Sequence, residues 1–320
     1  SSDRLKHYFT RFCNTSGYEP ALPIQRLYAT TIRKYVTNEP VISSTGSEQQ
    51  TPGPVLYLKL DEGQGQTAKD STNQNNHGQL GATSGSESSD PSWQKIGCLS
   101  QNCIQLDGTD DYVTISDSNK LDFGTGNFTV SFWINANKPL TSSNEYGLIN
   151  KNSNYQSNPG WGFEVSTWNI TEADKFNIAF FNTNHTWCTS CAQTPQTLQR
   201  NKWYHVVGIR EGTTNKLYID GILVKTRTHS DIGNTVDNAL NIIIGDHSWG
   251  PNFPGLIDEI KIYPYARTDS QVKSDYAQAV GTNGSTAVLG TSNKPELTDD
   301  LIGWWKMDET AANTCSGGVN

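Results

Sequence analysis

The sequence lacks an apolar run long enough to cross a bilayer. Its longest aliphatic stretch, residues 240–244, reads Leu-Asn-Ile-Ile-Ile, whereas a membrane-spanning helix needs roughly 18 apolar residues. It also lacks a block of Lys and Arg, and its net charge of −8 disfavours a nucleic-acid backbone or an anionic membrane as the partner. We therefore expect neither nucleic-acid binding nor membrane insertion.

Methionine, charge and cysteine are scarce. Met307 is the one methionine, which indicates a mature protein or an excised fragment. Only 18% of the residues are charged, while 28 Gly, 13 Pro, 9 Trp and 13 Tyr are typical of turn-rich β-structure. Six cysteines are too few for a fold built mainly on disulfides. They are typical of a few local disulfide bonds in a protein of an oxidising compartment. We therefore expect a secreted or cell-surface protein.

Familiar catalytic motifs are also missing. The sequence has no Gly-x-Ser-x-Gly, no His-Glu-x-x-His and no phosphate-binding loop. Glycoside hydrolysis needs two carboxylates about 5–9.5 Å apart. The acidic pairs Asp61-Glu62 and Asp258-Glu259 are adjacent in sequence, so in a strand their members point to opposite faces. We predict a protein that is not an enzyme.

What the sequence has is a long series of short strand patterns between residues 55 and 263. Asp220-Gly221 joins two of them as a two-residue hairpin turn. Thr268 and Gln271 form a capping box that begins one short helix after the series. Short strands without interleaved helices predict an all-β antiparallel sandwich. The strands are expected at residues 55–60, 103–107, 111–116, 127–135, 146–151, 161–166, 175–181, 203–210, 216–219, 222–227, 240–244 and 255–263.

The first 42 residues have a different pattern. Apolar side chains recur every three or four residues between Pro23 and Glu39, which predicts an amphipathic helix. This helix either docks on another part of the protein or binds a partner. Residues 43–54 are a polar linker with Gly and Pro.

The C-terminal end repeats an earlier motif. After a linker at residues 280–298, Trp-Trp-Lys-Met-Asp-Glu at 304–309 restates Tyr-Leu-Lys-Leu-Asp-Glu at 57–62. Residues 299–320 are therefore interpreted as the truncated start of a second repeat in a tandem-repeat protein.

Seven segments, in order along the chain, resemble the LamG-like jelly-roll domain of the concanavalin A-like lectin/glucanase superfamily. The resemblance spans about residues 54–279, and we take 55–279 as the domain. The resemblance implies a jelly-roll fold. Domains of this family occur in series in bacterial surface proteins, so the resemblance also implies a tandem-repeat surface protein. The segments are Leu58–Gly63, Asp70–Gly78, Ile104–Val113, Phe128–Ile134, Trp203–Val207, Leu217–Gly221 and Gly255–Tyr263.

The resemblance also implies a structural calcium ion. Hard cations take several oxygen ligands, which a polar loop and a late strand would supply if the first and last strands pair. The alternative is that the loop residues only build hydrogen-bonded turns. The implied ligands are Asp70, Asn73, Asn76, Gly78, Asp258 and Glu259.

The run Asp107-Gly-Thr-Asp-Asp111 is a second acidic candidate. We favour a tight turn there, because Gly108 supplies a positive φ and an aspartate side chain accepts from the loop amides.

Carbohydrate binding needs exposed aromatic rings beside polar groups. The loops offer such residues, and a glycan is the first-choice ligand, with a surface protein as the other partner. The candidate contacts are Tyr155, Trp168, Trp187, Trp249 and Asn252.

Cysteine spacing predicts two local disulfides, Cys98–Cys103 and Cys188–Cys191. For the second pair, a redox motif or a zinc site is the alternative, but the expected fold lacks the βαβ context and zinc needs further ligands. The sequence leaves open whether the remaining two pair with each other: Cys13 and Cys315.

The sequence as a whole predicts a non-catalytic, extracellular binding or adhesion module, with carbohydrate as the expected ligand. Two alternatives remain: a structural spacer repeat that binds nothing, and a glycosidase with an unrecognised carboxylate arrangement.

Overall fold

A computed structural model shows the fold of the central part of the chain, which lies in one compact unit, Glu48–Gly290. The predicted helix between Pro23 and Glu39 and the predicted repeat at 299–320 lie outside the described residues. The residues that the structure describes are 52–152, 159–172, 174–182, 190–247 and 250–280.

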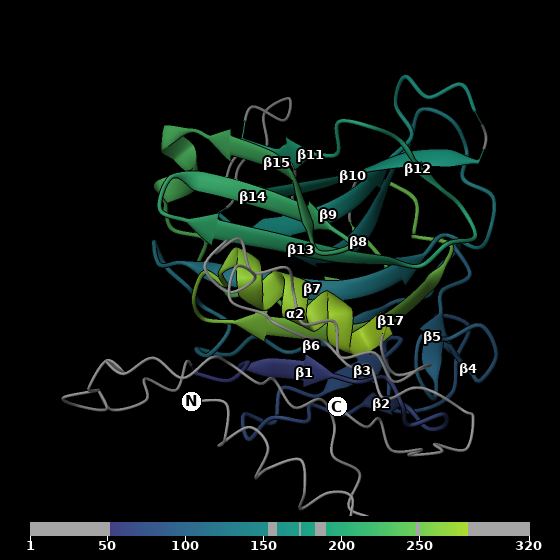
Figure 1. Ribbon diagram of the computed structural model, residues 1–320. Coiled ribbons are helices and arrows are strands. Elements are labelled where there is room, and N and C mark those ends of the chain that lie inside the picture. The colour runs from purple at the N-terminus through teal and green to yellow at the C-terminus, as the bar shows by residue number, and fades with distance from the viewer. Residues whose placement is uncertain (1–51, 153–158, 173, 183–189, 248–249, 281–320) are drawn as a thin grey trace, which may run out of the picture. The chain divides into compact units, whose positions relative to one another are not determined.

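Two antiparallel sheets build the unit (Figure 1). Sheet A runs in the order β15 (Ile222–Thr228), β14 (Thr214–Ile219), β13 (Tyr204–Glu211), β7 (Phe128–Asn135), β17 (Leu256–Tyr263), β5 (Cys103–Gln105) and β4 (Ser92–Gln94), with β1 (Leu56–Leu58) also paired to β17. Sheet B runs in the order β11 (Ala192–Gln193), β10 (Lys175–Asn182), β9 (Trp161–Ser166), β8 (Glu145–Lys151), β16 (Ile242–Ile244), β6 (Val113–Ile115), β3 (Gly78–Leu80) and β2 (Thr67–Ala68), with β12 (Leu198–Gln199) paired to β10.

The strands confirm the predicted all-β sandwich. Each predicted strand is present, with ends shifted by a few residues. The turn residues Asp220 and Gly221 have φ of 51° and 77°, as a two-residue hairpin turn requires. The sequence missed β2, β3, β4, β11 and β12, each of two or three residues, because so short a segment shows no alternation.

The core lies between the sheets, where alternate side chains of both sheets meet. Phe132 of sheet A and Phe163 of sheet B contact edge to face, with ring centroids 5.0 Å apart. Gly208 admits this packing, because a Cβ there would lie 2.3 Å from Cζ of Phe163. Many of the large aromatic residues that the composition points to thus pack between the two sheets.

One helix, α2 (Asp269–Val280), lies across the outer face of sheet A (Figure 1). The predicted capping box is present: the Thr268 amide donates to Gln271 Oε1 at 2.9 Å, and the Gln271 amide donates to Thr268 Oγ1 at 3.3 Å. Val272 is buried against three residues of the sheet, Val207, Ile209 and Tyr218.

A short 3₁₀ helix, η1 (Ser230–Gly233), completes the described elements. Within the described part of the chain, no helix has the length and apolar character to span a membrane.

Candidate functional site

Asp70, the first predicted calcium ligand, is the centre of a turn. Its Oδ1 accepts from the backbone amides of Tyr57 at 3.0 Å and Thr72 at 2.9 Å. Its Oδ2 accepts from Thr72 Oγ1 at 2.8 Å and from the Asn76 amide at 2.9 Å. Four donors therefore occupy the two oxygens. This is the turn alternative left open by the sequence, and it leaves the carboxylate poorly placed to bind a cation.

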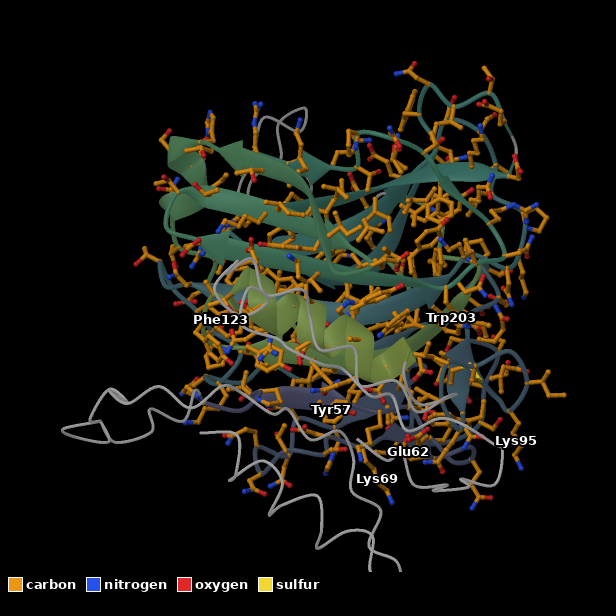
Figure 2. All side chains as sticks on the ribbon, in the orientation of Figure 1. Tyr57, Glu62, Lys69, Lys95, Phe123 and Trp203 are labelled. Atoms are coloured by element: carbon orange, nitrogen blue, oxygen red, sulfur yellow. A yellow bond between two sulfur atoms is a disulfide. The ribbon has the colours of Figure 1, made fainter. Side chains whose placement is uncertain are left out.

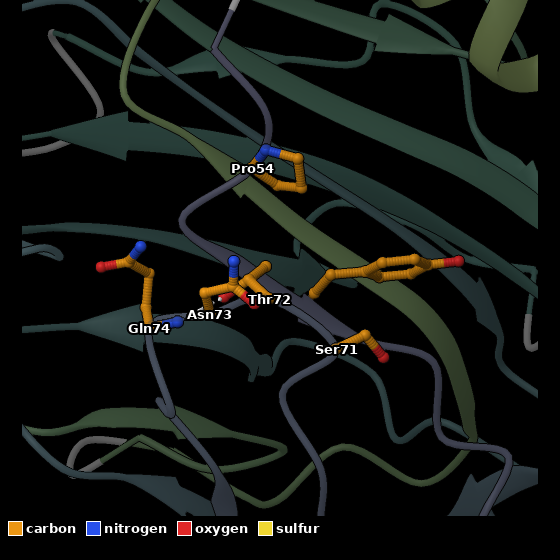
Figure 3. Close-up of a pocket in the computed structure, with 6 residues that line it drawn as sticks. Pro54, Ser71, Thr72, Asn73 and Gln74 are labelled. Carbon is orange, nitrogen blue, oxygen red and sulfur yellow. Dashed lines mark hydrogen bonds between the residues drawn. The ribbon is translucent and has the colours of Figure 1, made fainter.

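The other residues of this loop have separate roles. Asn76 donates through Nδ2 to the Val55 carbonyl at 3.0 Å, and Asn73 is exposed. Gly78 lies in β3, where a Cβ would come within 2.7 Å of Val113 Cγ1, so its role is close packing. The loop borders a shallow depression of about 390 Å³ (Figure 3), lined by Pro54, Tyr57, Ser71, Thr72, Asn73 and Gln74.

Asp258 and Glu259 lie on β17, which pairs with β1 as predicted. Asp258 is fully buried, and its Oδ2 accepts no hydrogen bond from the described residues. Burial, with the charges of Glu259 and Asp61, raises the pKa of Asp258 to about 8. Glu259 has a φ of 53° at an irregularity in the β17–β7 register. Its Oε2 accepts from the Tyr57 hydroxyl at 2.7 Å and lies 3.1 Å from Lys261 Nζ.

The carboxylates among the predicted calcium ligands do not form one cluster. In the described ranges, the carboxylates of Asp70, Asp258 and Glu259 do not lie mutually within 4.8 Å. The donor set of Asp70 does not fit a cation, whereas the buried, unpartnered Oδ2 of Asp258 does. The ion itself stays a prediction.

The acidic run at 107–111 forms the predicted turn and also a carboxylate cluster. Asp107 Oδ1 accepts from the Thr109 amide at 2.7 Å, and Gly108 has a φ of 85°. Asp107, Asp110 and Asp111 each place an oxygen within 4.8 Å of the others, so together they could hold a metal ion. Burial, with the charges of Asp107 and Asp110, raises the pKa of Asp111 to about 6.

A pair of glutamates that the sequence did not single out lies on the outer face of sheet B. Glu145 of β8 pairs with Ser166, and Gly147 pairs with Glu164 of β9. Glu145 and Glu164 are therefore diagonal neighbours on one face. Glu164 is 2% exposed, and burial together with the charge of Glu145 raises its pKa well above the ordinary carboxyl range. Burial also raises the pKa of Glu145.

The segment after β16 lies directly over this face. A Cβ on Gly147 would meet the Asp246 carbonyl at 2.5 Å, and one on Gly250 would meet the Glu145 carbonyl at 2.4 Å. Asn252, a predicted ligand contact, forms an isolated parallel β-bridge with Gly147, and its side chain is half-buried. Its Nδ2 donates to the Asp111 carbonyl at 3.2 Å, so this amide already fixes the loop.

Trp168 is the predicted aromatic contact that is clearly exposed. It follows β9 in a turn, and 52% of its surface is accessible. The turn is held to a neighbouring polar loop, because Thr167 Oγ1 donates to the Thr141 carbonyl at 2.7 Å and accepts from the Asn144 amide at 3.0 Å. Other predicted contacts lie outside the described residues: Tyr155, Trp187 and Trp249.

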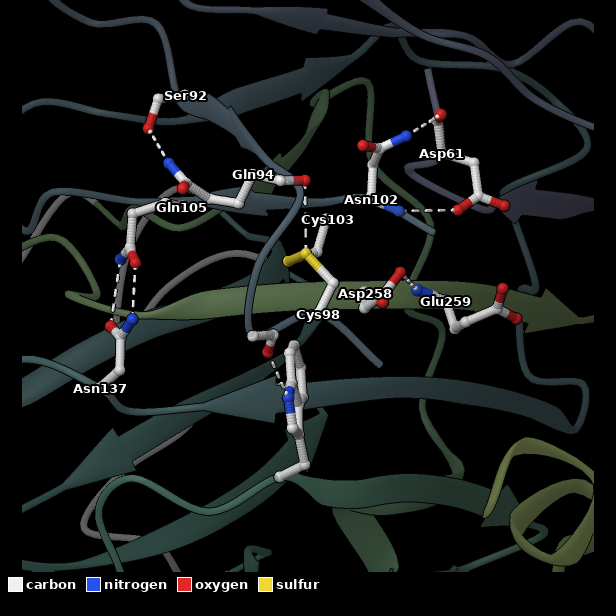
Figure 4. Close-up of a disulfide and its surroundings, with 12 residues drawn as sticks. Asp61, Ser92, Gln94, Cys98, Asn102, Cys103, Gln105, Asn137, Asp258 and Glu259 are labelled. Carbon is white, nitrogen blue, oxygen red and sulfur yellow. Dashed lines mark hydrogen bonds between the residues drawn. A yellow bond between two sulfur atoms is a disulfide. The ribbon is translucent and has the colours of Figure 1, made fainter. Parts of the chain in front are cut away.

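The predicted disulfide Cys98–Cys103 is present, with Cα atoms 5.4 Å apart (Figure 4). Cys191 is also disulfide-bonded, which excludes it as a thiolate ligand of zinc. Its predicted partner Cys188 lies outside the described residues, as do the two unassigned cysteines, Cys13 and Cys315.

Comparison with known proteins agrees with this architecture. A family model described as the concanavalin A-like lectin/glucanases superfamily matches residues 107–273. A comparison with curated protein sequences gives no match.

Several solved structures share the fold at low sequence identity. The binding domain of Paraclostridial Mosquitocidal Protein 1 is 19% identical with a TM-score of 0.50, and the match covers 71% of this chain and 52% of that one. Domain 4 of AbnA, a GH43 extracellular arabinanase from Geobacillus stearothermophilus, is 18% identical with a TM-score of 0.50, covering 71% and 98%. The receptor-binding domain of botulinum neurotoxin C/D mosaic serotype is 20% identical with a TM-score of 0.51, covering 71% and 51%. This chain thus spans about half of the two toxin domains.

Proposed function

Because the chain belongs to the concanavalin A-like lectin/glucanases superfamily, we propose that it is a non-catalytic, extracellular binding module whose ligand is a glycan. The AbnA domain, similar in fold, was solved in complex with arabinotriose. Fold likeness alone does not choose a ligand. The proposal therefore depends on the side chains that this chain presents.

The observation that carries the proposal is the exposed indole of Trp168. About half of the Trp168 surface is exposed, so this side chain gives up much of the stabilisation that burial would supply. Exposed aromatic rings of this kind are typical of surfaces that bind the apolar faces of ligands. The turn is held in place by Thr167, so the ring is presented with little conformational freedom. Asn144 and Thr141 lie in the loop bonded to this turn and offer polar groups for sugar hydroxyls.

A glycan array with Trp168→Ala tests the proposal. Loss of a stacked ring costs about 1–2 kcal/mol, so we expect roughly tenfold weaker binding, with partial retention in Trp168→Phe. Leu223→Ala is the matched control, because Leu223 is also an exposed apolar side chain, 41% accessible, on β15. Unchanged binding in Trp168→Ala would remove Trp168 from the site. Absence of binding to any glycan would favour the structural spacer.

Extracellular location and a structural calcium ion are part of the same proposal. The disulfide Cys98–Cys103 and the bonded Cys191 are the chemistry of an oxidising compartment. Calcium, when bound, would bridge loop oxygens and stabilise the sandwich rather than take part in a reaction. The array repeated with EDTA tests whether glycan binding needs the ion.

The Glu145–Glu164 pair favours a second candidate, glycoside hydrolysis. Two carboxyl groups on one sheet face, one of them inclined to keep its proton, are the elements of a general acid and its partner carboxylate. Reducing-sugar release from mixed polysaccharides, lost in Glu164→Gln and in Glu145→Gln but kept in the exposed-site control Glu172→Gln, would establish it. If no reducing sugar is released from any polysaccharide, hydrolysis is rejected and the binding module stays as the proposed function.

A further inference from the structure

β15 forms one edge of sheet A (Figure 1). Among the described residues it pairs only with β14, so the backbone groups that point away from β14 have no strand partner there. With seven residues, β15 is nearly as long as the inner strands β7 and β13, which have eight each. Proteins usually shorten or cover such an edge, because an open one pairs readily with another strand.

The first half of β15 is apolar and exposed. Ile222 is 64% exposed and Leu223 is 41% exposed. The other large apolar side chains that are exposed in the described ranges, Ile96 and Trp168, have no such neighbour in sequence. Contiguous exposed apolar side chains are typical of surfaces that contact another protein.

A groove of about 520 Å³ opens beside this part of the strand. Ile222 pairs with the buried Ile219 of β14, so the two side chains lie on the same face of sheet A and both line the groove. Residues 194–199, which follow β11 and include β12, line it as well. The apolar side chains of the lining belong to Leu198, Tyr204, Ile219, Ile222 and Val224.

The groove is held in place by hydrogen bonds outside β15. The Gln199 amide donates to the Tyr204 hydroxyl at 3.0 Å, which joins β12 to the start of β13. Trp203, labelled in Figure 2, fixes the residue before Tyr204, because its Nε1 donates to the Gly97 carbonyl at 2.8 Å. A groove that is formed before the ligand arrives binds it at a lower cost in conformational entropy.

The second half of β15 is basic, although the chain as a whole has a net charge of −8. Lys225 and Arg227 are exposed, and Lys225 makes no ion pair with any described residue. They pair with alternate residues of β14, Leu217 and Asn215, and so share a face with Ile222. Lys225 is also the middle residue of β15, so a second copy paired antiparallel and centred on this strand would place Lys225 opposite Lys225. The strand therefore disfavours a second copy and favours an acidic partner.

We propose that β15 and the groove beside it bind an extended, acidic peptide segment of a partner protein by strand addition. Main-chain hydrogen bonds to the free edge supply affinity, while an apolar side chain of the peptide in the groove and acidic side chains opposite Lys225 and Arg227 supply selectivity. Basic residues that only blunted the edge would not account for the exposed apolar half of the strand. Trp168 does not line the groove, and the site does not depend on glycan binding.

Fluorescence anisotropy of the full chain with labelled peptides, each as long as β15, tests the proposal. The probes alternate Thr with Glu or Val, and a matched set has Lys in place of Glu. We expect the Glu peptides to bind, and about tenfold weaker binding in Ile222→Ser and by the Lys peptides. Ile96→Ser, at a position 90% exposed elsewhere, should bind as the wild type does. No binding of any Glu peptide, or unchanged binding in Ile222→Ser, would overturn the site.

Charge reversal and backbone methylation test the two parts of the mechanism. Lys225→Glu/Arg227→Glu should prefer the Lys peptides, at an unchanged unfolding temperature because both positions are exposed. Only alternate peptide nitrogens face the neighbouring strand, so N-methylation of one alternate set should abolish binding and N-methylation of the other should not. Binding that survives both methylations would overturn strand addition.

Two more measurements separate this site from its rivals. Analytical ultracentrifugation of the full chain detects a second copy: a dimer that is lost in Ile222→Ser would assign the edge to self-association and overturn the proposal. Trp168→Ala should bind the Glu peptides as the wild type does. Because no sugar is present in any of these experiments, failure of peptide binding leaves the glycan proposal standing.

Discussion

Lys151 Nζ lies 2.6 Å from Asp117 Oδ1, although the lysine side chain is only 1% exposed. A second carboxylate, of Asp122, is 3.2 Å away, and Nζ also donates to the carbonyls of Asn238 and Leu240. The ammonium group thereby joins the end of β8 to the segments around residues 117–122 and 238–240, which are far apart in sequence.

Replacing this lysine should destabilise the sandwich strongly. Lys151→Met keeps the buried stem but leaves two carbonyls without their donor, so we expect a loss of about 2–4 kcal/mol in the free energy of unfolding by urea. Lys175→Met is the control, because the Lys175–Glu172 pair is exposed and should contribute less than about 1 kcal/mol. Equal losses in the two variants would contradict the role given to Lys151.

His205 should make stability fall in acid. It is buried against Trp133 and Tyr276, and its Nε2 lies 2.9 Å from Ser131 Oγ. Burial, with the charge of Lys261 and of the nearby Arg267, lowers the pKa of His205 to about 3. Between that value and the ordinary pKa near 6.5, the unfolded chain takes up a proton that the folded chain does not.

The free energy of unfolding should therefore decrease as pH falls from about 6.5 to about 3, by at most about 1.4 kcal/mol per pH unit from this group. His205→Gln lacks the titration, so the wild-type value minus the variant value should drop across that window. A difference that stays constant with pH would disprove the assignment.

Asp70 should stabilise the folded protein through the hydrogen bonds of its turn, whether or not calcium is present. In EDTA, Asp70→Asn turns two of the four acceptor contacts into donor–donor contacts, and we expect a loss of about 2–3 kcal/mol by urea unfolding. Asn73→Ala, an exposed position in the same loop, should stay within about 0.5 kcal/mol of the wild type. A large loss in Asn73→Ala that appears only with calcium would restore the loop as a metal site.

The fold was largely readable from the sequence, because its signals are local. Alternation in segments such as 128–135, the Asp220-Gly221 turn and the Thr268 capping box each depend on residues within a few positions of one another. Strands such as β2 and β11 exist only because a neighbouring strand provides hydrogen bonds, and two residues carry no periodicity.

The candidate sites could be predicted from the sequence only in part, because they depend on the register in which the strands pair. Glu145 and Glu164 are unremarkable in their own strands and meet only through the β8–β9 pairing. Likewise, Asp61 lies 197 positions before Asp258, so the sequence could not show that the two carboxylates influence each other. The resemblance made Glu259 an expected calcium ligand together with Asp258, but the Glu259 carboxylate accepts a hydrogen bond from the Tyr57 hydroxyl.

Glu164 should make the protein less stable as pH rises. Its raised pKa means that the folded chain keeps a proton that the unfolded chain releases at a lower pH. Stability from this group is therefore complete below the ordinary glutamate pKa and is lost as pH rises towards the higher, folded-state value. Glu164→Gln keeps the shape without the charge and should escape this loss.

Urea unfolding of the wild type and Glu164→Gln between pH 4 and pH 8 measures the effect. We expect near-equal stability at the acidic end and a growing advantage of the variant towards neutral pH, by at most about 1.4 kcal/mol per pH unit. Glu172→Gln changes an exposed carboxylate whose pKa is lowered, not raised, by its hydrogen bond with Lys175, and this variant should not gain stability towards neutral pH. If Glu164→Gln is less stable than the wild type at pH 8, the carboxylate is charged and compensated in the folded protein. A general acid at this position would then be untenable, since the proton it must donate would already be gone.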